Sequence, residues 1–293
     1  MTGRVAVIGL GRMGAAMARR IHGSGLELIL WNRDRAKSEA VSELTGATVA
    51  GSAAEAAAQS DFVLSSLADD AALDSVYLGA DGIVAGIGEG SIAIDTSTVD
   101  PGTIMRVGEA MDATGAGFLD CPVSGSVSTV EAGALTVMAG GEERLIKEAE
   151  PLLAAISSRI IHVGPLGAGA ACKLAVNALV HGLNVALAEA LVLAEKAGVA
   201  RETAYEVFVS GVGGAPFVKY KREAYENPDS APVAFSLDLV KKDLELITEL
   251  ARRLGAPMAQ AQAGLEIVRR ALARGLGPRD MSAIAVLLRE SPV

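Results

Sequence analysis

The chain has 293 residues, of which 51% are hydrophobic and 21% are charged, so it is long enough for two globular domains with a sizeable core. Its formal net charge of -9 argues against nucleic acid as the main partner, because phosphate binding needs a basic patch. Two cysteines, Cys121 and Cys172, make no framework of disulfides or metal ligands and fit a reducing compartment. We therefore expect a cytoplasmic protein without a metal site.

Two apolar segments are candidates for a signal peptide or a membrane-spanning helix. Residues 5–8 are too few for the core of a signal peptide and lead straight into a glycine loop. Residues 174–194 have the length of a membrane span, but they carry Asn177, His181 and Asn184. Polar side chains are costly inside a bilayer, so we predict a core helix and no membrane partner.

The first motif follows a short apolar strand at residues 4–8, which reads as a buried parallel strand. The next six residues form a GxGxxG loop: Gly9, Leu10, Gly11, Arg12, Met13 and Gly14. In this motif the first glycine permits a tight turn, the second admits a pyrophosphate, and the third lets helix and strand pack closely. A helical pattern follows directly, so the sequence predicts a dinucleotide site, with a plain glycine turn as the alternative.

The end of the second strand, at residues 27–31, is where such folds distinguish NAD from NADP. The next residue is Asn32 rather than an acid, and Arg33 after it suits a ribose 2′-phosphate. We therefore predict that NADP(H) is preferred, with NAD(H) possible. Two alternatives stay open: Asn32 or Asp34 caps the next helix, or Asp34 is the acid that binds the ribose.

Further strands are expected at residues 48–49, 61–65, 91–94, 117–119, 134–139 and 159–163. Together they predict an α/β Rossmann domain, a mostly parallel doubly wound sheet, over residues 1–164. Leu67 and Thr98 follow two of these strands, at the sheet edge where ligands bind. The hydroxyls of Thr96, Ser97 and Thr98 can bond a ligand or their own turn, and we expect the turn for at least two of them.

A second loop follows the strand at residues 117–119. Ser124 beside Gly125 offers a hydroxyl and nearby amide groups that could hold a carboxylate. A serine nucleophile is poorly supported, because the chain has three histidines and no GxSxG motif. Cys121 is better explained as a buried structural cysteine than as a nucleophile.

A long apolar helix is predicted over residues 168–196, where neither proline nor a turn cluster interrupts seven helical turns. Its Ala, Leu and Val content predicts burial nearly all round. Lys173, Asn177, His181 and Asn184 nevertheless recur at spacings of four, four and three, which places them on one stripe. A lysine there must face water, a partner or a ligand. A solvent channel or a subunit contact is the alternative to a ligand site.

The remaining chain reads as helices, so residues 165–293 are predicted to form an all-helical domain. One helix is expected over residues 235–254, and Asp243 falls within its apolar half. A carboxylate in that position needs a cation or hydrogen-bond donors. A salt bridge would satisfy it, or it pairs with the polar stripe, for example with Lys173 or a ligand beside it.

Four segments in this order resemble the β-hydroxyacid dehydrogenase family, which includes 3-hydroxyisobutyrate dehydrogenases, tartronate semialdehyde reductases and glyoxylate/succinic semialdehyde reductases. They are residues 9–14, residues 120–125, residues 167–173 with Asn177, and residues 242–244. The resemblance covers nearly the whole chain. It implies a Rossmann domain joined to a helical domain by one long helix, and a homodimer or homotetramer formed through the helical domains.

The resemblance also implies roles for single residues. Lys173 is the expected general acid, which protonates the carbonyl oxygen as hydride arrives from the nicotinamide, and Asn177 is expected to orient the substrate and the lysine. Ser124 and Gly125 are expected to hold the substrate carboxylate. Other matched positions that line the nicotinamide or the substrate are Thr98, Phe235, Lys242 and Asp243.

Two residues depart from the family pattern. Ser126 stands in the carboxylate pocket where the family often has glycine, and Val176 stands where an asparagine is common. Both cast doubt on the usual small substrates. Two other functions remain alternatives: an imine reductase on the same fold, which usually lacks the lysine, and a non-catalytic NADP-binding or scaffold protein.

Overall fold

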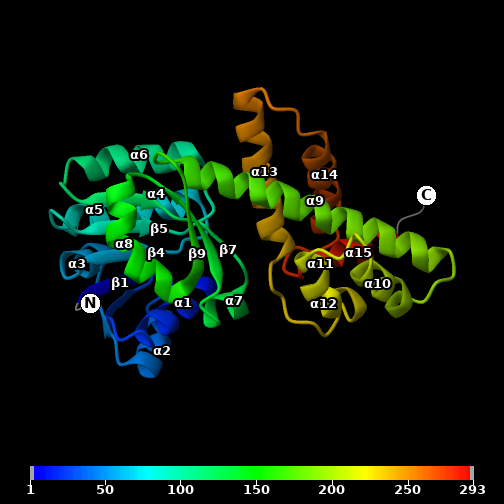
Figure 1. The fold of residues 1–293 in the computed structure, drawn as a ribbon, viewed down its shortest axis with the longest axis horizontal. Coiled ribbons are helices and arrows are strands. Elements are labelled where there is room, and N and C mark those ends of the chain that lie inside the picture. The colour runs from blue at the N-terminus through cyan, green and yellow to red at the C-terminus, as the bar shows by residue number, and fades with distance from the viewer. Residues whose placement is uncertain (1–2, 291–293) are drawn as a thin grey trace. The chain divides into compact units, whose positions relative to one another are not determined.

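The computed structural model describes residues 3–290, and the chain divides into two compact units (Figure 1). The first unit ends at Lys173 and the second begins at Leu174. The predicted boundary after Gly164 lies slightly earlier, because the first residues of the long helix belong to the first unit. Each unit is described separately below.

The first unit is built on one sheet whose parallel strands have the order β3-β2-β1-β4-β5-β6. These strands are β1 (Arg4–Ile8), β2 (Glu27–Trp31), β3 (Thr48–Val49), β4 (Phe62–Ser65), β5 (Ile92–Asp95) and β6 (Gly117–Asp120). Strand β8 (Leu135–Gly140) is antiparallel to β6 and to β7 (Val123–Ser124), and β9 (Ser157–Gly164) is parallel to β8. The order reverses between β1 and β4, which confirms the predicted doubly wound Rossmann fold and places its ligand edge at the carboxyl ends of the strands.

Both faces of this sheet are buried. The helices of this unit are α1 (Arg12–His22), α2 (Arg35–Thr45), α3 (Ala53–Ala58), α4 (Asp70–Leu78), α5 (Ile83–Gly86), α6 (Pro101–Asp112), α7 (Val127–Glu131) and α8 (Glu143–Ile156). Along β1, Val5 and Val7 join one apolar core with α1 and α8, whereas Ala6 and Ile8 join another with α3, α4 and α6. This alternation follows from strand geometry, and it explains why the strand is a continuous apolar run.

Helix α9 (Ala168–Lys196) has the predicted bounds. The expectation that it is buried nearly all round is wrong, because Leu179 and Leu193 are 66% and 72% exposed. Its other side contributes Leu174 and Leu191 to the core of the second unit. By length and composition α9 is the one helix among residues 3–290 that could cross a membrane, but half of its most apolar window is buried inside the protein.

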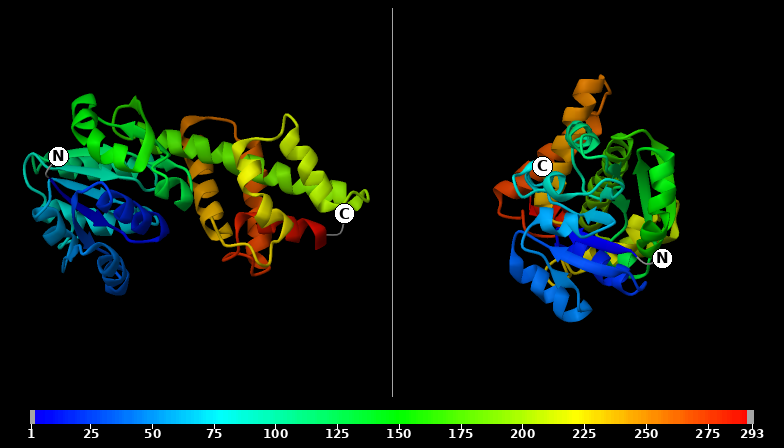
Figure 2. Two further views of the ribbon diagram at one scale, coloured as in Figure 1. Left: turned by 60° about the horizontal axis from the view of Figure 1, so that its bottom comes forward. Right: turned by 90° about the vertical axis from the view of Figure 1, so that its left-hand side faces the viewer.

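The second unit packs further helices against α9 around one apolar core (Figure 2). They are α10 (Arg201–Ser210), α11 (Pro216–Tyr220), α12 (Arg222–Glu226), α13 (Leu237–Leu254), α14 (Ala259–Ala273), the 3-10 turn η1 (Met281–Ala283) and α15 (Ile284–Glu290). Helix α13 begins two residues later than predicted. Ser236 caps it by accepting a hydrogen bond from the Leu239 amide at 3.4 Å, so Phe235 lies in the preceding loop.

Candidate active site

The glycine loop after β1 leaves no room for a side chain at Gly9 or Gly14. Gly9 has a φ of +88°, and a Cβ on it would overlap the Ser66 carbonyl oxygen and lie 2.9 Å from Leu67 Cδ2. A Cβ on Gly14 would overlap the Gly9 carbonyl oxygen. Gly11 is the N-cap residue of α1 and offers no side chain to cap the first turn. The loop therefore has the shape, and α1 the bare N-terminus, that bind a pyrophosphate.

The turn after β2 is organised by Asn32. Its Oδ1 accepts a hydrogen bond from the Leu10 amide at 2.9 Å, and its Nδ2 donates to the Asp34 carbonyl at 2.9 Å. Asp34 caps α2 by accepting from the Ala36 amide at 3.2 Å. Arg33 is exposed and forms no ion pair with the residues that the structure describes. Of the two alternatives that the sequence leaves open for this turn, the structure shows the cap, and the capping residue is Asp34.

The turn after β5 is held by a buried carboxylate that the sequence did not single out. Asp95 accepts hydrogen bonds from Ser65 Oγ at 2.6 Å, from Ser97 Oγ at 2.7 Å and from the Ser97 amide at 3.0 Å. Ser97 Oγ in turn accepts from the Leu67 amide at 2.8 Å, and Thr96 Oγ1 donates to the Ser65 carbonyl at 2.7 Å. The Ser97 hydroxyl therefore bonds its own turn, as expected, whereas the Thr96 hydroxyl bonds the end of the neighbouring strand β4. Thr98, at the sheet edge, is partly exposed.

The buried Asp95 should make stability depend on pH. Burial raises the pKa of Asp95 from 3.8 to about 6, against the hydrogen bonds from Ser65 and Ser97 that lower it. The folded state then binds more protons than the unfolded state between these values, so this stabilising contribution is present at low pH and is lost as pH rises through 6. From pH 7 to about 4.5, wild type is expected to gain about 2 kcal/mol relative to Asp95→Asn in urea unfolding.

The control is Asp112→Asn, which makes the same substitution at an exposed carboxylate and so shows what removing one surface charge does to the unfolding curves. Parallel curves for wild type and Asp95→Asn would contradict the raised pKa of Asp95.

The loop after β6 carries the predicted carboxylate-binding residues. Ser124 is partly exposed at the end of β7. Gly125 has a φ of +144°, and a Cβ on it would lie 2.6 Å from Leu135 Cδ2, so only glycine fits. Ser126 caps α7, with its Oγ 3.1 Å from Thr129 Oγ1. The Ser126 hydroxyl thus stabilises the turn, a role that its sequence position did not predict.

The start of α9 is attached to the end of β6 by Asp120. Its carboxylate is buried and accepts hydrogen bonds from the Ala170 amide at 2.7 Å and from the Gly167 amide at 3.1 Å. Lys173 follows in the next turn of α9 and is partly exposed. Cys121 is fully buried, and burial raises its pKa well above the ordinary value, which supports a structural role.

In the second unit, a buried cluster surrounds Asp243. Asn177 Nδ2 donates to Asp243 Oδ2 at 2.7 Å, and His181 Nε2 lies 3.4 Å from the same oxygen. Lys242 Nζ lies 3.1 Å from Oδ1, and the Phe235 ring lies 5.9 Å from the His181 ring. Burial alone would raise the pKa of Asp243, but the His181 hydrogen bond and the Lys242 ammonium outweigh it and hold this pKa below its usual value. The cation and donors expected for Asp243 are present, and two come from the polar stripe.

A second buried ion pair in this unit was not predicted from the sequence. Lys221 Nζ lies 2.8 Å from both carboxylate oxygens of Asp280, and the two side chains are 1% and 7% exposed. Asp280 Oδ2 also accepts from the amides of Ala234 at 2.9 Å and Phe235 at 3.2 Å. The pair therefore holds the loop that carries Phe235. The partners are 59 residues apart, so no local pattern could reveal them.

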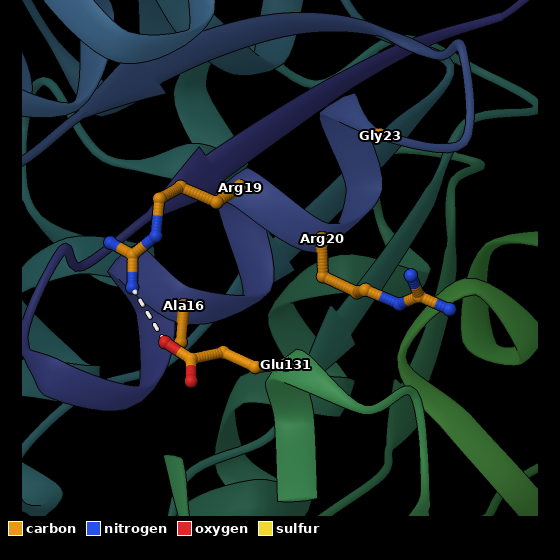
Figure 3. A pocket seen from close by; sticks show the side chains of 5 residues that line it. All are labelled: Ala16, Arg19, Arg20, Gly23 and Glu131. Carbon is orange, nitrogen blue, oxygen red and sulfur yellow. Dashed lines mark hydrogen bonds and ion pairs between the residues drawn. The ribbon is translucent and has the colours of Figure 1, made fainter. Parts of the chain in front are cut away.

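One surface pocket on α1 is lined by Arg19, Arg20 and Glu131 together with Ala16 and Gly23 (Figure 3). Arg19 Nη2 lies 3.4 Å from Glu131 Oε1, and Arg20 Nε donates to the Ala155 carbonyl at 3.1 Å. Both guanidinium groups are thus engaged by the protein. None of the predicted site residues lines this pocket.

Comparisons with known proteins cover nearly the whole chain. A family model described as the NAD binding domain of 6-phosphogluconate dehydrogenase matches residues 4–164. One described as the NAD-binding domain of NADP-dependent 3-hydroxyisobutyrate dehydrogenase matches residues 167–288. The chain is 34% identical to glyoxylate/succinic semialdehyde reductase 1 of Arabidopsis thaliana, over 96% of each chain. It is 33% identical to 2-(hydroxymethyl)glutarate dehydrogenase of Eubacterium barkeri, over 96% of this chain and 93% of that one.

Solved structures agree with these matches. The 3-hydroxyisobutyrate dehydrogenase of Mycobacterium tuberculosis, in a structure with L-serine, superposes with a TM-score of 0.87 at 29% identity, over 99% of this chain and 100% of that one. An imine reductase from Pseudomonas sp. gives a TM-score of 0.66 at 21% identity, over 98% of this chain and 100% of that one. The second likeness shows a shared fold only.

Proposed function

The chain belongs to the 3-hydroxyisobutyrate dehydrogenase family of NAD(P)-dependent oxidoreductases, and we propose that it reversibly reduces a small semialdehyde or keto acid with NADPH. One observation carries the proposal: the binding loops follow parallel strands at a single edge of the sheet. The glycine loop follows β1, Leu67 follows β4, and Thr98 follows β5. Ser124 and Gly125 come shortly after β6 in the chain, beside the strand edge from which α9 starts.

The nicotinamide cofactor supplies the hydride when it is bound, and the glycine loop fits its pyrophosphate. In the proposed reduction, the Lys173 ammonium donates a proton to the carbonyl oxygen, and the resulting amine regains a proton from solvent. Ser124 Oγ and the Gly125 amide bind the substrate carboxylate. Asn177 follows Lys173 by one turn of α9. Because its Nδ2 is bonded to Asp243, its Oδ1 is the atom proposed to accept a hydrogen bond from the hydroxyl group that the reduction forms.

The NADP(H) preference is proposed to depend on Arg33. Arg33→Ala is expected to lower kcat/KM for NADPH about 100-fold while changing the value for NADH less than threefold, because a guanidinium–phosphate pair is lost with only one cofactor. Initial rates with each cofactor measure this ratio. The control is Arg35→Ala, since Arg35 already pairs with Glu39 at 2.9 Å and its loss should leave the ratio unchanged. Equal loss with both cofactors would contradict the role of Arg33.

The reaction is tested by measuring NADPH and NADH oxidation with glyoxylate and with succinic, methylmalonic and tartronic semialdehydes. Rapid NADPH consumption with one of them supports the proposal. If NADPH binds but none of them reacts, the proposal fails, and ketone–amine pairs then test the imine reductase alternative. The presence of Lys173 favours the first function over the second.

We also propose that the protein is a homo-oligomer associated through its helical unit. The support is that one helix, α9, exposes two large apolar side chains, Leu179 and Leu193, since exposed apolar surface is a mark of interaction sites. Light scattering of the purified protein gives the number of copies directly.

A further inference from the structure

The end of β6 contains a buried carboxylate with no assigned role. Asp120 is 0% exposed, and its two oxygens accept amide hydrogen bonds from Gly167 and Ala170. These amides belong to the approach and first turn of α9. A carboxylate at a helix N-terminus both satisfies amide groups that lack partners and complements the helix dipole.

The packing around this carboxylate leaves no room for a Cβ at the two neighbouring glycines, Gly169 and Gly140. A Cβ on Gly169 would overlap the Asp120 carbonyl oxygen and lie 2.7 Å from the Met138 carbonyl oxygen. A Cβ on Gly140 would overlap Asp120 Oδ1 and lie 2.8 Å from the Gly169 amide nitrogen. The obstacles are backbone atoms and the Asp120 carboxylate itself, which its amide hydrogen bonds hold in place. The first turn of α9 is thus seated directly on strands β6 and β8.

We propose that Asp120 is a positioning residue that sets the location of Lys173, an inference that rests on the proposed function. Lys173 lies three residues after Ala170 in the same helix, so a clamp on the Ala170 amide also fixes the lysine backbone. Only three residues of chain separate Asp120 from Ser124. The Asp120 side chain therefore fixes the position of the proposed acid, Lys173, relative to the proposed carboxylate site at Ser124. A displacement of about 1 Å between such groups lowers rates roughly 100-fold.

The neighbouring strand supplies a matched carboxylate. Asp95 is paired in register with Asp120 on β5 and is equally buried. Its hydrogen bonds go to Ser65 and Ser97, which shape the cofactor-side turns rather than α9. Replacing either aspartate by asparagine removes one buried charge at the same sheet edge. Only Asp120→Asn also turns one of the two acceptor oxygens that face the amides of Gly167 and Ala170 into an NH2 donor.

The experiment compares Asp120→Asn, Asp95→Asn and wild type at pH 8, where both carboxylates are ionised. For Asp120→Asn we expect kcat to fall about 10- to 100-fold, with the NADPH dissociation constant within twofold of wild type. Hydrogen exchange of the segment 165–174 should accelerate. For Asp95→Asn we expect weaker NADPH binding and unchanged exchange in that segment. Gly169→Ala should reproduce the Asp120→Asn pattern without altering any charge.

Two results would overturn the inference. The first is wild-type exchange of segment 165–174 in Asp120→Asn, which would show that no clamp exists, whatever the substrate. The second is an equal loss of NADPH binding and kcat, which would show a merely structural role. Failure of the proposed function is distinguishable, because wild type itself would then reduce none of the semialdehydes and Lys173→Ala would change nothing.

Discussion

Replacing Lys173 with alanine is expected to lower kcat by about three orders of magnitude and to leave the NADPH dissociation constant within about twofold. A positioned general acid contributes roughly 10²- to 10⁴-fold to a rate, and here the developing alkoxide would lose its proton donor. The glycine loop and the Asn32 turn, which are expected to bind the cofactor, are held by their own contacts, such as the hydrogen bond from the Leu10 amide to Asn32 Oδ1. Stopped-flow absorbance of NADPH measures the hydride step, and fluorescence titration measures cofactor binding.

Two further variants separate proton donation from positive charge and from helix stability. Lys173→Arg keeps the charge but titrates far above neutrality, so it should be nearly as slow as alanine. Lys196→Ala removes the exposed lysine at the end of the same helix and should retain full activity. A Lys173→Ala enzyme within tenfold of wild type would rule out the proposed acid.

Some parts of this site could be predicted from the sequence because they depend only on residues that are adjacent in the chain. The glycine loop needs only a strand, three glycines and a helix in succession, and the structure shows that a Cβ on Gly9 or Gly14 would collide with backbone. The bounds of α9 followed from a glycine-rich start and an uninterrupted apolar run. The core assignment of β1 followed from its continuous apolar residues.

The parts that join distant segments could not be predicted in this way. Asp120 binds amides 47 and 50 residues further along the chain, and nothing in its own neighbourhood indicates this. Helical periodicity places Asp243 in the apolar half of its helix and so requires a cation or donors, but it cannot choose among Lys173, Asn177 and His181. The sequence predicts that this helix begins at Phe235. Its amide instead bonds Asp280, and the helix begins after it.

The largest stability effect is expected from Lys221→Met, which should lower the free energy of unfolding by about 3–5 kcal/mol. Removing one partner of a buried ion pair leaves the other charge without compensation, which costs this much in proteins. Lys221 is 1% exposed, and both of its contacts to Asp280 are 2.8 Å long. Methionine keeps most of the side-chain volume, so the loss reports charge rather than a cavity. Urea unfolding measures it.

Lys241→Met is the matched control, because Lys241 pairs with Glu245 at 3.0 Å on an exposed helix face and such pairs contribute at most about 1 kcal/mol. The pKa of Asp280 lies below 3.8, since the Lys221 ammonium outweighs the effect of burial. The pair therefore stabilises the fold above that pH, and the deficit of Lys221→Met should shrink as acid protonates Asp280. A deficit equal to that of Lys241→Met would show that the amides of Ala234, Phe235 and Ser282, which donate to Asp280, suffice to hold the Phe235 loop.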